Sequence, residues 1–237
     1  MIVPVFNGAR FLRDAVASIR AQDVTGLEIV VVDDGSTDGS AEIAGTLGLH
    51  ALVQENRGPA AARNTGVLAA RSSVLAFLDV DDLWAHGWLG AALPRLLAEP
   101  EAIVLGRTRA VPLDPDSTRD TALPQAPVVA LVPGAAVLTR KTFDRVGGFD
   151  PSLRFGEDLA FFLAARELGH AVLVLEEACL LYRLHDGNSV RGRNSRDLNV
   201  MRVLHESLAR RAAGAGGARA DLPALRRAGP APTPESR

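Results

Sequence analysis

The chain has 237 residues, of which 47% are hydrophobic, and a formal net charge of −2 at pH 7. This length and apolar content suffice for one large or two small domains with a full core. Residues 191–237 hold ten arginines and four acidic residues, a balance of +6, which leaves −8 for the first 190 residues. The small net charge predicts no nucleic-acid partner. The basic C-terminal region could contact a membrane surface, although solvated arginine-rich tails are commoner.

Rare residue types exclude several classes of site. Cys179 is the sole cysteine, so an internal disulfide and a cysteine-cluster zinc site are excluded. Lys141 is the sole lysine and lies outside any Walker-type phosphate loop. No apolar run approaches the ~20 residues of a membrane span, and the N-terminus begins inside an apparent strand rather than a signal peptide. We therefore expect a cytoplasmic protein, with membrane association left open.

Apolar runs alternate with amphipathic helices over the first 78 residues. The predicted strands cover residues 2–6, 27–32, 51–53 and 74–78, and the predicted helices cover residues 9–22, 41–47 and 60–70. Pro4 lacks a backbone N–H, which predicts a strand end or a bulge there. The alternation predicts a doubly wound parallel sheet, in which right-handed crossovers bring the carboxyl ends of the strands to one rim. Open sheets of this class bind their ligands at that rim.

An acidic cluster, Asp79-Val80-Asp81-Asp82, directly follows the fourth predicted strand. Three carboxylates so close together repel one another unless a cation lies among them. Hard oxygen ligands suit Mg²⁺ or Mn²⁺, which usually bridge one or two carboxylates to substrate phosphates. Alternatively, Asp81 or Asp82 caps the helix that follows.

Two further groups of charged residues lie at strand ends or helix starts. Asp33 and Asp34 follow the second predicted strand and begin a run with turn chemistry throughout. They either shape this turn or accept hydrogen bonds from a base N–H or a ribose hydroxyl. Arg63 lies in the first turns of the helix after Pro59, where the helix dipole disfavours a cation. A nearby anion would explain Arg63, and an ordinary surface arginine is the alternative.

The second half continues with mixed elements. We expect helices at residues 87–99, 141–146 and 197–211, and a helix that starts near Leu159; strands at 102–105, 128–132, 135–139 and 171–175; and a loop at 108–127. Pro94 should kink or break the first of these helices. From Ala212 onward the Ala/Gly/Pro/Arg-rich composition predicts disorder.

Four segments of the first half share their order and spacing with a known family. They are Pro4-Val5-Phe6-Asn7-Gly8, Val32-Asp33-Asp34-Gly35-Ser36-Thr37-Asp38, Asn56-Arg57-Gly58 with Ala62-Arg63-Asn64-Thr65-Gly66, and Leu78-Asp79-Val80-Asp81-Asp82. Together they resemble the successive motifs of family-2 glycosyltransferases, a resemblance that covers roughly residues 2–190. It implies the GT-A fold, an α/β architecture with a mixed, mainly parallel sheet flanked by helices. It also implies a nucleoside-diphosphate sugar as donor, with UDP-sugars favoured.

The resemblance implies roles for particular residues. The donor-binding residues would be Pro4, Val5, Phe6, Asp33, Asp34, Arg63, Asp79 and Val80, with Asp34 or Asp33 toward the base and Asp79 toward ribose or metal. Asp81 and Asp82 would hold Mg²⁺ or Mn²⁺. The segment Tyr182-Arg183-Leu184-His185 is similar to a late family segment, in which His185 would be a third metal ligand.

The catalytic base follows from a further segment. Gly147-Gly148-Phe149-Asp150 with Phe155-Gly156-Glu157-Asp158 resembles the acceptor-side motif of the family. It implies Asp158 as general base, with Glu157 as the alternative, and inversion at the anomeric carbon. A general base must lie within hydrogen-bond reach of the hydroxyl that it deprotonates. The alternative is a simple helix start, because acidic residues favour the first turn.

The sequence leaves several questions open. We expect a single GT-A domain over residues 1–205, divided into a donor half (1–105) and an acceptor half (106–205), and a tail from 212 to 237. Phe6 replaces the usual tyrosine, so that base stacking survives but a hydroxyl contact does not. The acceptor is a glycan, a lipid-linked sugar or a natural product. A non-catalytic sugar-nucleotide-binding protein and a nucleotidyltransferase remain alternatives, whereas no G-x-G-x-x-G supports a dehydrogenase.

Overall fold

The computed structural model of the protein describes residues 1–113, 126–188, 194, 197–214 and 221–229. A parallel sheet of order β1-β2-β3 contains β1 (Ile2–Val5), β2 (Val30–Asp33) and β3 (Ala51–Val53). A mixed sheet of order β4-β7-β6-β8-β5 contains β4 (Val74–Ala76), β7 (Ala136–Thr139), β6 (Ile103–Pro112), β8 (Val172–Leu184) and β5 (Leu83–Trp84), and β9 (Arg226–Arg227) pairs with β8. The predicted mixed, mainly parallel sheet is confirmed.

The two sheets meet beside Pro4. Ile2 bridges Phe77 in parallel, and the Leu78 N–H donates to the Ile2 carbonyl at 3.0 Å. Residues two apart in a strand direct their backbone groups to the same side, so the position of the missing Pro4 N–H also faces the β4 side. Opposite Pro4, the chain has left β4 and enters the acidic turn. The missing Pro4 N–H therefore costs no hydrogen bond of the sheet. The predicted strand end or bulge at Pro4 is therefore wrong: Pro4 lies inside β1, in regular register with Val32, on the side of the strand where its missing N–H has no partner.

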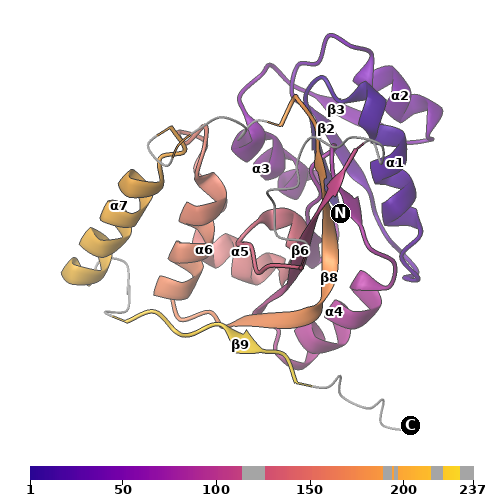
Figure 1. Cartoon of the computed structure of the whole chain (residues 1–237). Helices are drawn as coiled ribbons and strands as arrows, with labels where there is room; N and C mark the ends of the chain where they lie inside the picture. Colours follow the sequence, from indigo (N-terminus) through magenta and orange to yellow (C-terminus); the bar gives the residue numbers. More distant parts are fainter. Residues whose placement is uncertain (114–125, 189–193, 195–196, 215–220, 230–237) are drawn as a thin grey trace, which may run out of the picture.

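Helices cover both faces of the combined sheet (Figure 1). They are α1 (Ala9–Arg20), α2 (Ser40–Thr46), α3 (Pro59–Ala69), α4 (Trp88–Ala98), α5 (Arg140–Val146), α6 (Glu157–Glu167) and α7 (Val200–Ala213), with a 3₁₀ turn at Pro133–Ala135. In Figure 1, α1 and α2 lie on one side of the sheet and α3, α5 and α6 on the other. In the described part of the chain, no helix is both long and apolar enough to cross a bilayer.

One large hydrophobic core joins the two halves of the chain. It contains Ile2 and Val32 from the first sheet and Leu105, Leu138 and Leu175 from the second. A smaller cluster of Leu153, Leu163 and Val203 fastens α7 to α6. Because both sheets contribute to the same core, the rim at which they meet is held on rigid elements.

Several predictions for the second half were wrong. Residues 108–112, predicted as loop, extend β6, which pairs with β8 as far as Pro112–Leu184; residues 114–125 lie outside the described residues. Of the strand predicted at 128–132, Val128 alone forms a bridge, to Thr108. β8 continues nine residues beyond the predicted end at Leu175, since its pairing partners β6 and β5 extend with it. Helix α4 runs through Pro94, so the break that was one alternative there does not occur, and the kink stays a prediction.

The predicted disorder after Ala212 is wrong for residues 221–229. Within this segment β9 pairs in parallel with Leu173 and Val174 of β8. Arg226 forms an ion pair with Glu99 at 2.5 Å, and Arg227 forms one with Glu176 at 3.3 Å. Arg210 pairs with Glu167 and Arg202 with Glu206, both at 2.8 Å, so at least four of the ten arginines of the basic C-terminal region are paired within the protein. Residues 215–220 and 230–237 lie outside the described part.

Candidate active site

The predicted acidic cluster forms a tight turn at the rim where the two sheets meet. The Asp82 N–H donates to the Asp79 carbonyl at 3.0 Å, and β5 begins at the next residue. This arrangement places Asp79, Asp81 and Asp82 at one strand end. The alternative role as helix cap does not apply, because a strand and not a helix follows the turn.

Arg63 joins two separate acidic segments. Its Nη2 donates to Asp79 Oδ1 at 2.7 Å and its Nη1 to Glu157 Oε1 at 3.0 Å. The side chain is buried, its guanidinium lies 5.5 Å from the centre of the Phe149 ring, and its pKa is raised above the usual range by the two carboxylates against the effect of burial. The nearby anion that would explain Arg63 is thus a pair of carboxylates of the protein itself, Asp79 and Glu157.

His185 contacts the acidic turn from the end of β8. Its Nε2 lies 3.1 Å from Asp81 Oδ2. Its Nδ1 accepts a hydrogen bond from the Gly187 N–H at 3.1 Å, and Arg10 Nη2 lies 3.4 Å from the same atom. Since Nδ1 accepts, the neutral ring carries its proton on Nε2 and donates it to Asp81. Asp81 and His185 therefore form a hydrogen-bonded pair, and the role of His185 as a metal ligand stays a prediction.

The two carboxylates at the end of the turn are in different situations. Burial, and next the charge of Asp79, raise the pKa of Asp81 above its ordinary value. Burial, followed by the charges of Asp81 and Asp79, raises the pKa of Asp82 well above its ordinary value. Asp82 Oδ1 also accepts from the backbone N–H of Arg183 at 3.0 Å. Ionised together, these groups repel one another, which is the electrostatic condition that a bound cation relieves.

Asp158 lies at the first turn of α6, beside the end of the Arg63 network. Gly156 precedes the helix with φ of +83°, and a Cβ there would lie 2.8 Å from the Leu198 carbonyl oxygen, so only glycine fits. Asp158 Oδ1 accepts from the Leu159 N–H at 2.7 Å. Burial is the main cause that raises the pKa of Asp158 above its ordinary value, and Asp79 adds to it.

Glu157 and Asp158 differ in what holds them. Burial raises the pKa of Glu157, and the charge of Arg63 opposes this shift. One Glu157 oxygen accepts from Arg63, which fixes the carboxylate toward the protein. Among the described residues, the Asp158 carboxylate accepts a hydrogen bond only from the N–H of its neighbour Leu159. The geometry therefore favours Asp158 over Glu157 as the group left for a substrate.

The Asp33–Asp34 pair is bound mainly by backbone. Asp34 accepts from Gln54 Nε2 at 2.6 Å, from the Arg57 N–H at 3.0 Å and from the Gly58 N–H at 2.8 Å. Asp33 Oδ1 accepts from the Ser36 N–H at 2.7 Å, and both residues are buried. A carboxylate offers about four acceptor positions, so Asp34 retains about one and Asp33 about three.

The other predicted donor residues lie around the same rim. Pro4 and Val5 are buried within β1, and Val80 is buried inside the acidic turn. Phe6, directly after β1, keeps 51% of its surface exposed. An exposed aromatic ring at the mouth of a polar rim can stack on a base.

A metal ion would need ligands beyond these side chains. Among the described residues, no three His, Cys, Asp or Glu side chains converge on one point in the way a self-sufficient metal site requires. Asp81 Oδ2 and His185 Nε2 lie 3.1 Å apart, and Nε2 can bind an ion only when its proton moves to Nδ1, which then loses the hydrogen bond from the Gly187 N–H. Mg²⁺ and Mn²⁺ commonly take their remaining ligands from substrate phosphates and water. The residues present thus fit an ion that binds together with a diphosphate.

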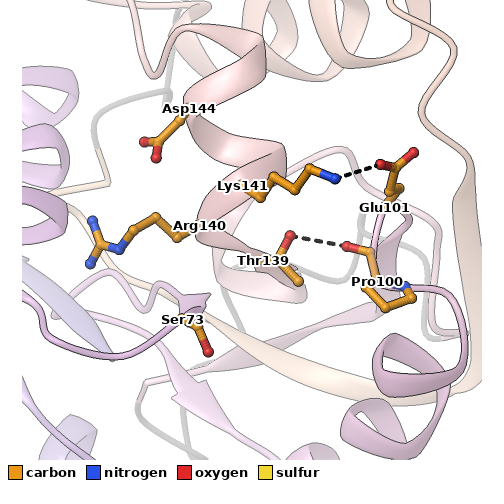
Figure 2. A pocket seen from close by; sticks show the side chains of 7 residues that line it. All are labelled: Ser73, Pro100, Glu101, Thr139, Arg140, Lys141 and Asp144. Atoms are coloured by element: carbon orange, nitrogen blue, oxygen red, sulfur yellow. Dashed lines mark hydrogen bonds and ion pairs between the residues drawn. The ribbon is translucent and has the colours of Figure 1, made fainter.

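One hollow of the described surface lies away from the predicted site residues. Figure 2 shows this open depression of about 590 Å³, lined by Ser73, Pro100, Glu101, Thr139, Arg140, Lys141 and Asp144. Lys141 pairs with Glu101 across it at 3.0 Å. None of the predicted site residues line this hollow. Ligands of open α/β sheets bind at the carboxyl ends of the strands, where the acidic turn lies.

Sequence reasoning missed three residues of the site. Arg183 contacts the backbone of the acidic turn, and Asn188 Oδ1 accepts from the His185 N–H at 2.6 Å. Tyr182 stands close enough to the carboxylates that burial, and then the charges of Asp82 and Asp81, raise its pKa to about 12. The signal that could have found Arg183 was its place inside the late family segment; a single sequence offers none for Asn188.

Comparison with known proteins decides the family. The sequence model of Glycosyl transferase family 2 matches residues 1–157. The chain belongs to this family. It is 35% identical over 179 residues to the pre-mycofactocin glycosyltransferase of Mycobacterium tuberculosis, covering 67% of this chain and 37% of that protein. It is 30% identical over 210 residues to the uncharacterized glycosyltransferase EpsJ of Bacillus subtilis, covering 77% and 60%.

Solved structures show the same fold. Residues 1–349 of TarS from S. aureus, in complex with UDP-GlcNAc, match with a TM-score of 0.69 at 24% identity, covering 87% of this chain and 65% of that one. The mannosyltransferase PcManGT from Pyrobaculum calidifontis, in complex with GDP-Man and Mn²⁺, matches with a TM-score of 0.65 at 21% identity, covering 90% and 63%. The fold is GT-A. The chain spans less than two thirds of the length of each protein named here.

Proposed function

We propose that this chain transfers a sugar from a nucleoside-diphosphate sugar, with UDP-sugars favoured, to an acceptor hydroxyl with inversion. One observation carries the proposal: the buried Arg63 binds Asp79 of the acidic turn and Glu157 beside Asp158. Through Arg63, the acidic turn proposed to bind metal and diphosphate and the proposed base Asp158 would act at the same rim, although the two are about 80 residues apart in the sequence.

The donor would bind across the strand ends. Phe6 would stack on the base, and the Asp33–Asp34 pair would accept from base or ribose groups through its remaining lone pairs. Asp33 retains more of these positions than Asp34. Asp79, whose side chain is 40% exposed, would face ribose or metal. The UDP-GlcNAc and GDP-Man complexes of proteins with this fold support a nucleotide-sugar donor.

Mg²⁺ or Mn²⁺ would be held by Asp81 and Asp82, and His185 would be a third ligand once its Nε2 proton has moved to Nδ1. The ion supplies Lewis-acid stabilisation of the negative charge that develops on the departing diphosphate. The chain's own contribution is to keep these carboxylates clustered at the end of β4. The Mn²⁺ in the PcManGT complex supports a divalent ion.

Asp158 would act as the general base. Its free carboxylate oxygen takes the proton of the acceptor hydroxyl while the acceptor oxygen forms a bond to the anomeric carbon. The bond from that carbon to the diphosphate breaks on the opposite face, which inverts the configuration. The raised pKa of Asp158, caused by burial, strengthens it as a base.

Product analysis with the full chain tests the proposal. The chain would be incubated with UDP-sugars or GDP-sugars, Mn²⁺ and a panel of hydroxyl acceptors. Release of nucleoside diphosphate coupled to a glycosylated product is expected. Pyrophosphate would indicate a nucleotidyltransferase instead, and donor binding without either product would indicate a non-catalytic sugar-nucleotide-binding protein.

A further inference from the structure

Arg183, near the end of β8, is a buried arginine to which the proposed chemistry gives no role. Its Nε donates to the Asp81 carbonyl at 2.5 Å and its Nη2 to the Val80 carbonyl at 3.5 Å. Its own backbone N–H donates to Asp82 Oδ1 at 3.0 Å. One residue thus contacts three successive residues of the acidic turn, through two carbonyl groups and one carboxylate.

The rest of the side chain is equally constrained. Arg183 Nη1 donates to Asp14 Oδ2 of α1 at 2.9 Å, and the guanidinium lies 5.0 Å from the centre of the Phe11 ring. The His185 ring packs on the same Phe11 ring, with their centres 4.7 Å apart. Phe11 therefore supports both the arginine that holds the turn and the histidine that contacts Asp81.

Asn188 fixes the chain around Arg183. Its Nδ2 donates to the Arg183 carbonyl at 3.1 Å, and its Oδ1 accepts from the His185 N–H at 2.6 Å. Since these bonds close residues 183–188 into a turn, Arg183 and His185 cannot move independently. The acidic turn and the end of β8 form one hydrogen-bonded unit.

We propose that Arg183 is a positioning residue that holds the Asp79–Asp82 turn against the mutual repulsion of its carboxylates, so that Asp81 is already placed for the metal-bound diphosphate. This inference rests on the proposed function. Within the acidic turn, the Arg183 guanidinium contacts backbone carbonyls and not the carboxylate oxygens. It therefore does not occupy the position that a cation would take among those carboxylates. A fork with several donors can bind two carbonyls and Asp14 together, which a lysine cannot.

A second arginine provides a matched control. Arg140 donates to the carbonyls of Val67 at 2.9 Å and Ala70 at 2.6 Å, where α3 ends. It lies by the open hollow of Figure 2, away from the acidic turn. Arg140→Lys therefore removes the same kind of backbone contact without touching the site.

The test compares the full chain with Arg183→Lys, Arg140→Lys and Asp14→Asn. Mn²⁺ and UDP, or GDP where UDP does not bind, are titrated by calorimetry, and backbone amide hydrogen exchange is measured without metal. We expect Arg183→Lys to weaken Mn²⁺-dependent nucleotide binding about 10- to 100-fold, as loss of a residue supporting a metal ligand typically does. Exchange at residues 79–84 should accelerate in Arg183→Lys and stay unchanged in Arg140→Lys.

Asp14→Asn covers the case in which Arg183→Lys does not fold. The Asp14 side chain is 63% exposed, so its loss leaves the fold intact and weakens binding in the same direction by a smaller factor. Equal binding in all variants, or faster exchange at residues 79–84 in Arg140→Lys as well, would overturn the inference while the proposed function stands. If the unmodified chain binds no nucleotide with Mn²⁺, the proposed donor site fails, and the inference fails with it.

Discussion

Two acidic strand ends of similar sequence have different surroundings. Asp34, after β2, accepts three hydrogen bonds from Gln54 and from two backbone N–H groups. In the turn after β4, burial and neighbouring carboxylates raise the pKa of Asp81 and Asp82. Asp34 is largely satisfied by the protein, whereas the acidic turn is left with repulsion that a ligand can relieve. Hydrogen-bond partners, and not motif identity, separate the two.

This contrast suggests that the two strand ends have different roles, one in stabilising the fold and one in binding a ligand. The Asp34 contacts bind the start of α3 to the end of β2, and α3 carries Arg63. Arg63 then binds Asp79 and Glu157. Asp34 stabilises the fold at the end of β2. Through α3 and Arg63 it also helps to position Asp79 and Glu157, and the charges of the acidic turn do not themselves stabilise the fold. The following predictions test this division, beginning with the largest effect.

Asp158→Asn should lower turnover by about 10²- to 10⁴-fold, because the amide cannot accept the acceptor proton. Glu157→Gln keeps an oxygen that accepts from Arg63 and should lose much less. Steady-state rates of nucleoside diphosphate release at saturating donor and acceptor compare the two variants, with thermal unfolding as a check on folding. Equal losses in both variants would contradict the assignment of Asp158 as the base.

Asp34→Ala should lower the free energy of unfolding by about 3 kcal/mol, because buried N–H donors lose their charged acceptor. Asp81→Ala removes the same residue type from the acidic turn and should leave the unfolding free energy unchanged or higher. Urea denaturation of both variants without metal measures the difference. Similar destabilisation by the two substitutions would remove the distinction between the strand ends.

The sequence predicted the first half well because its signals are local. Each strand from Ile2 to Ala76 is short and bounded by turn residues, and β1, β2 and β3 pair in the order in which they follow one another along the chain. The extension of β6 to Pro112 was missed because the segment after Thr108 has a loop-like composition. Its pairing with β8 overrides that preference, and this tertiary contact is not written in the segment itself.

The candidate site was predicted in part for a similar reason. The order and spacing of the motifs pointed to Asp81, Asp158 and His185, and the structure brings Asp81 and His185 together. The sequence did not reveal that the anion for Arg63 is a pair of carboxylates, or that Arg183 donates hydrogen bonds to the acidic turn. Both depend on side chains of segments more than 90 residues away, Glu157 for Arg63 and the turn for Arg183, which no local pattern encodes.

Activity should rise with pH through a limb that lies above the ordinary aspartate value of about 3.9. The general base must be ionised, and burial raises the pKa of Asp158, with Arg63 opposing and Asp79 reinforcing the shift. Below that limb, kcat/KM should fall about tenfold per pH unit. Profiles of nucleoside diphosphate release at constant ionic strength would measure it. A residual rate in Asp158→Asn that keeps the same acid limb would assign the limb to another group.

The smallest expected effect concerns stability without metal. Asp82 has a folded-state pKa raised by burial and by Asp81 and Asp79, so the folded protein binds more protons than the unfolded chain between the two pKa values. Stability due to this group is therefore lost as pH rises through that window. Asp82→Asn removes the charge but keeps an oxygen that can accept the Arg183 N–H, so it should raise the unfolding free energy at pH 7 by about 1 kcal/mol.

The pH and ligand dependence of this gain distinguish charge relief from better packing. The difference between Asp82→Asn and the unmodified chain should shrink as pH falls below the ordinary aspartate value, because Asp82 is then neutral in both states. It should also shrink or reverse with Mn²⁺ and nucleoside diphosphate, since a cation among the carboxylates removes the repulsion only where the charge is present. Thermal unfolding at two pH values with and without these ligands measures both. A gain that is independent of pH would mean that the acidic turn, like the Asp34 strand end, is satisfied by the protein alone.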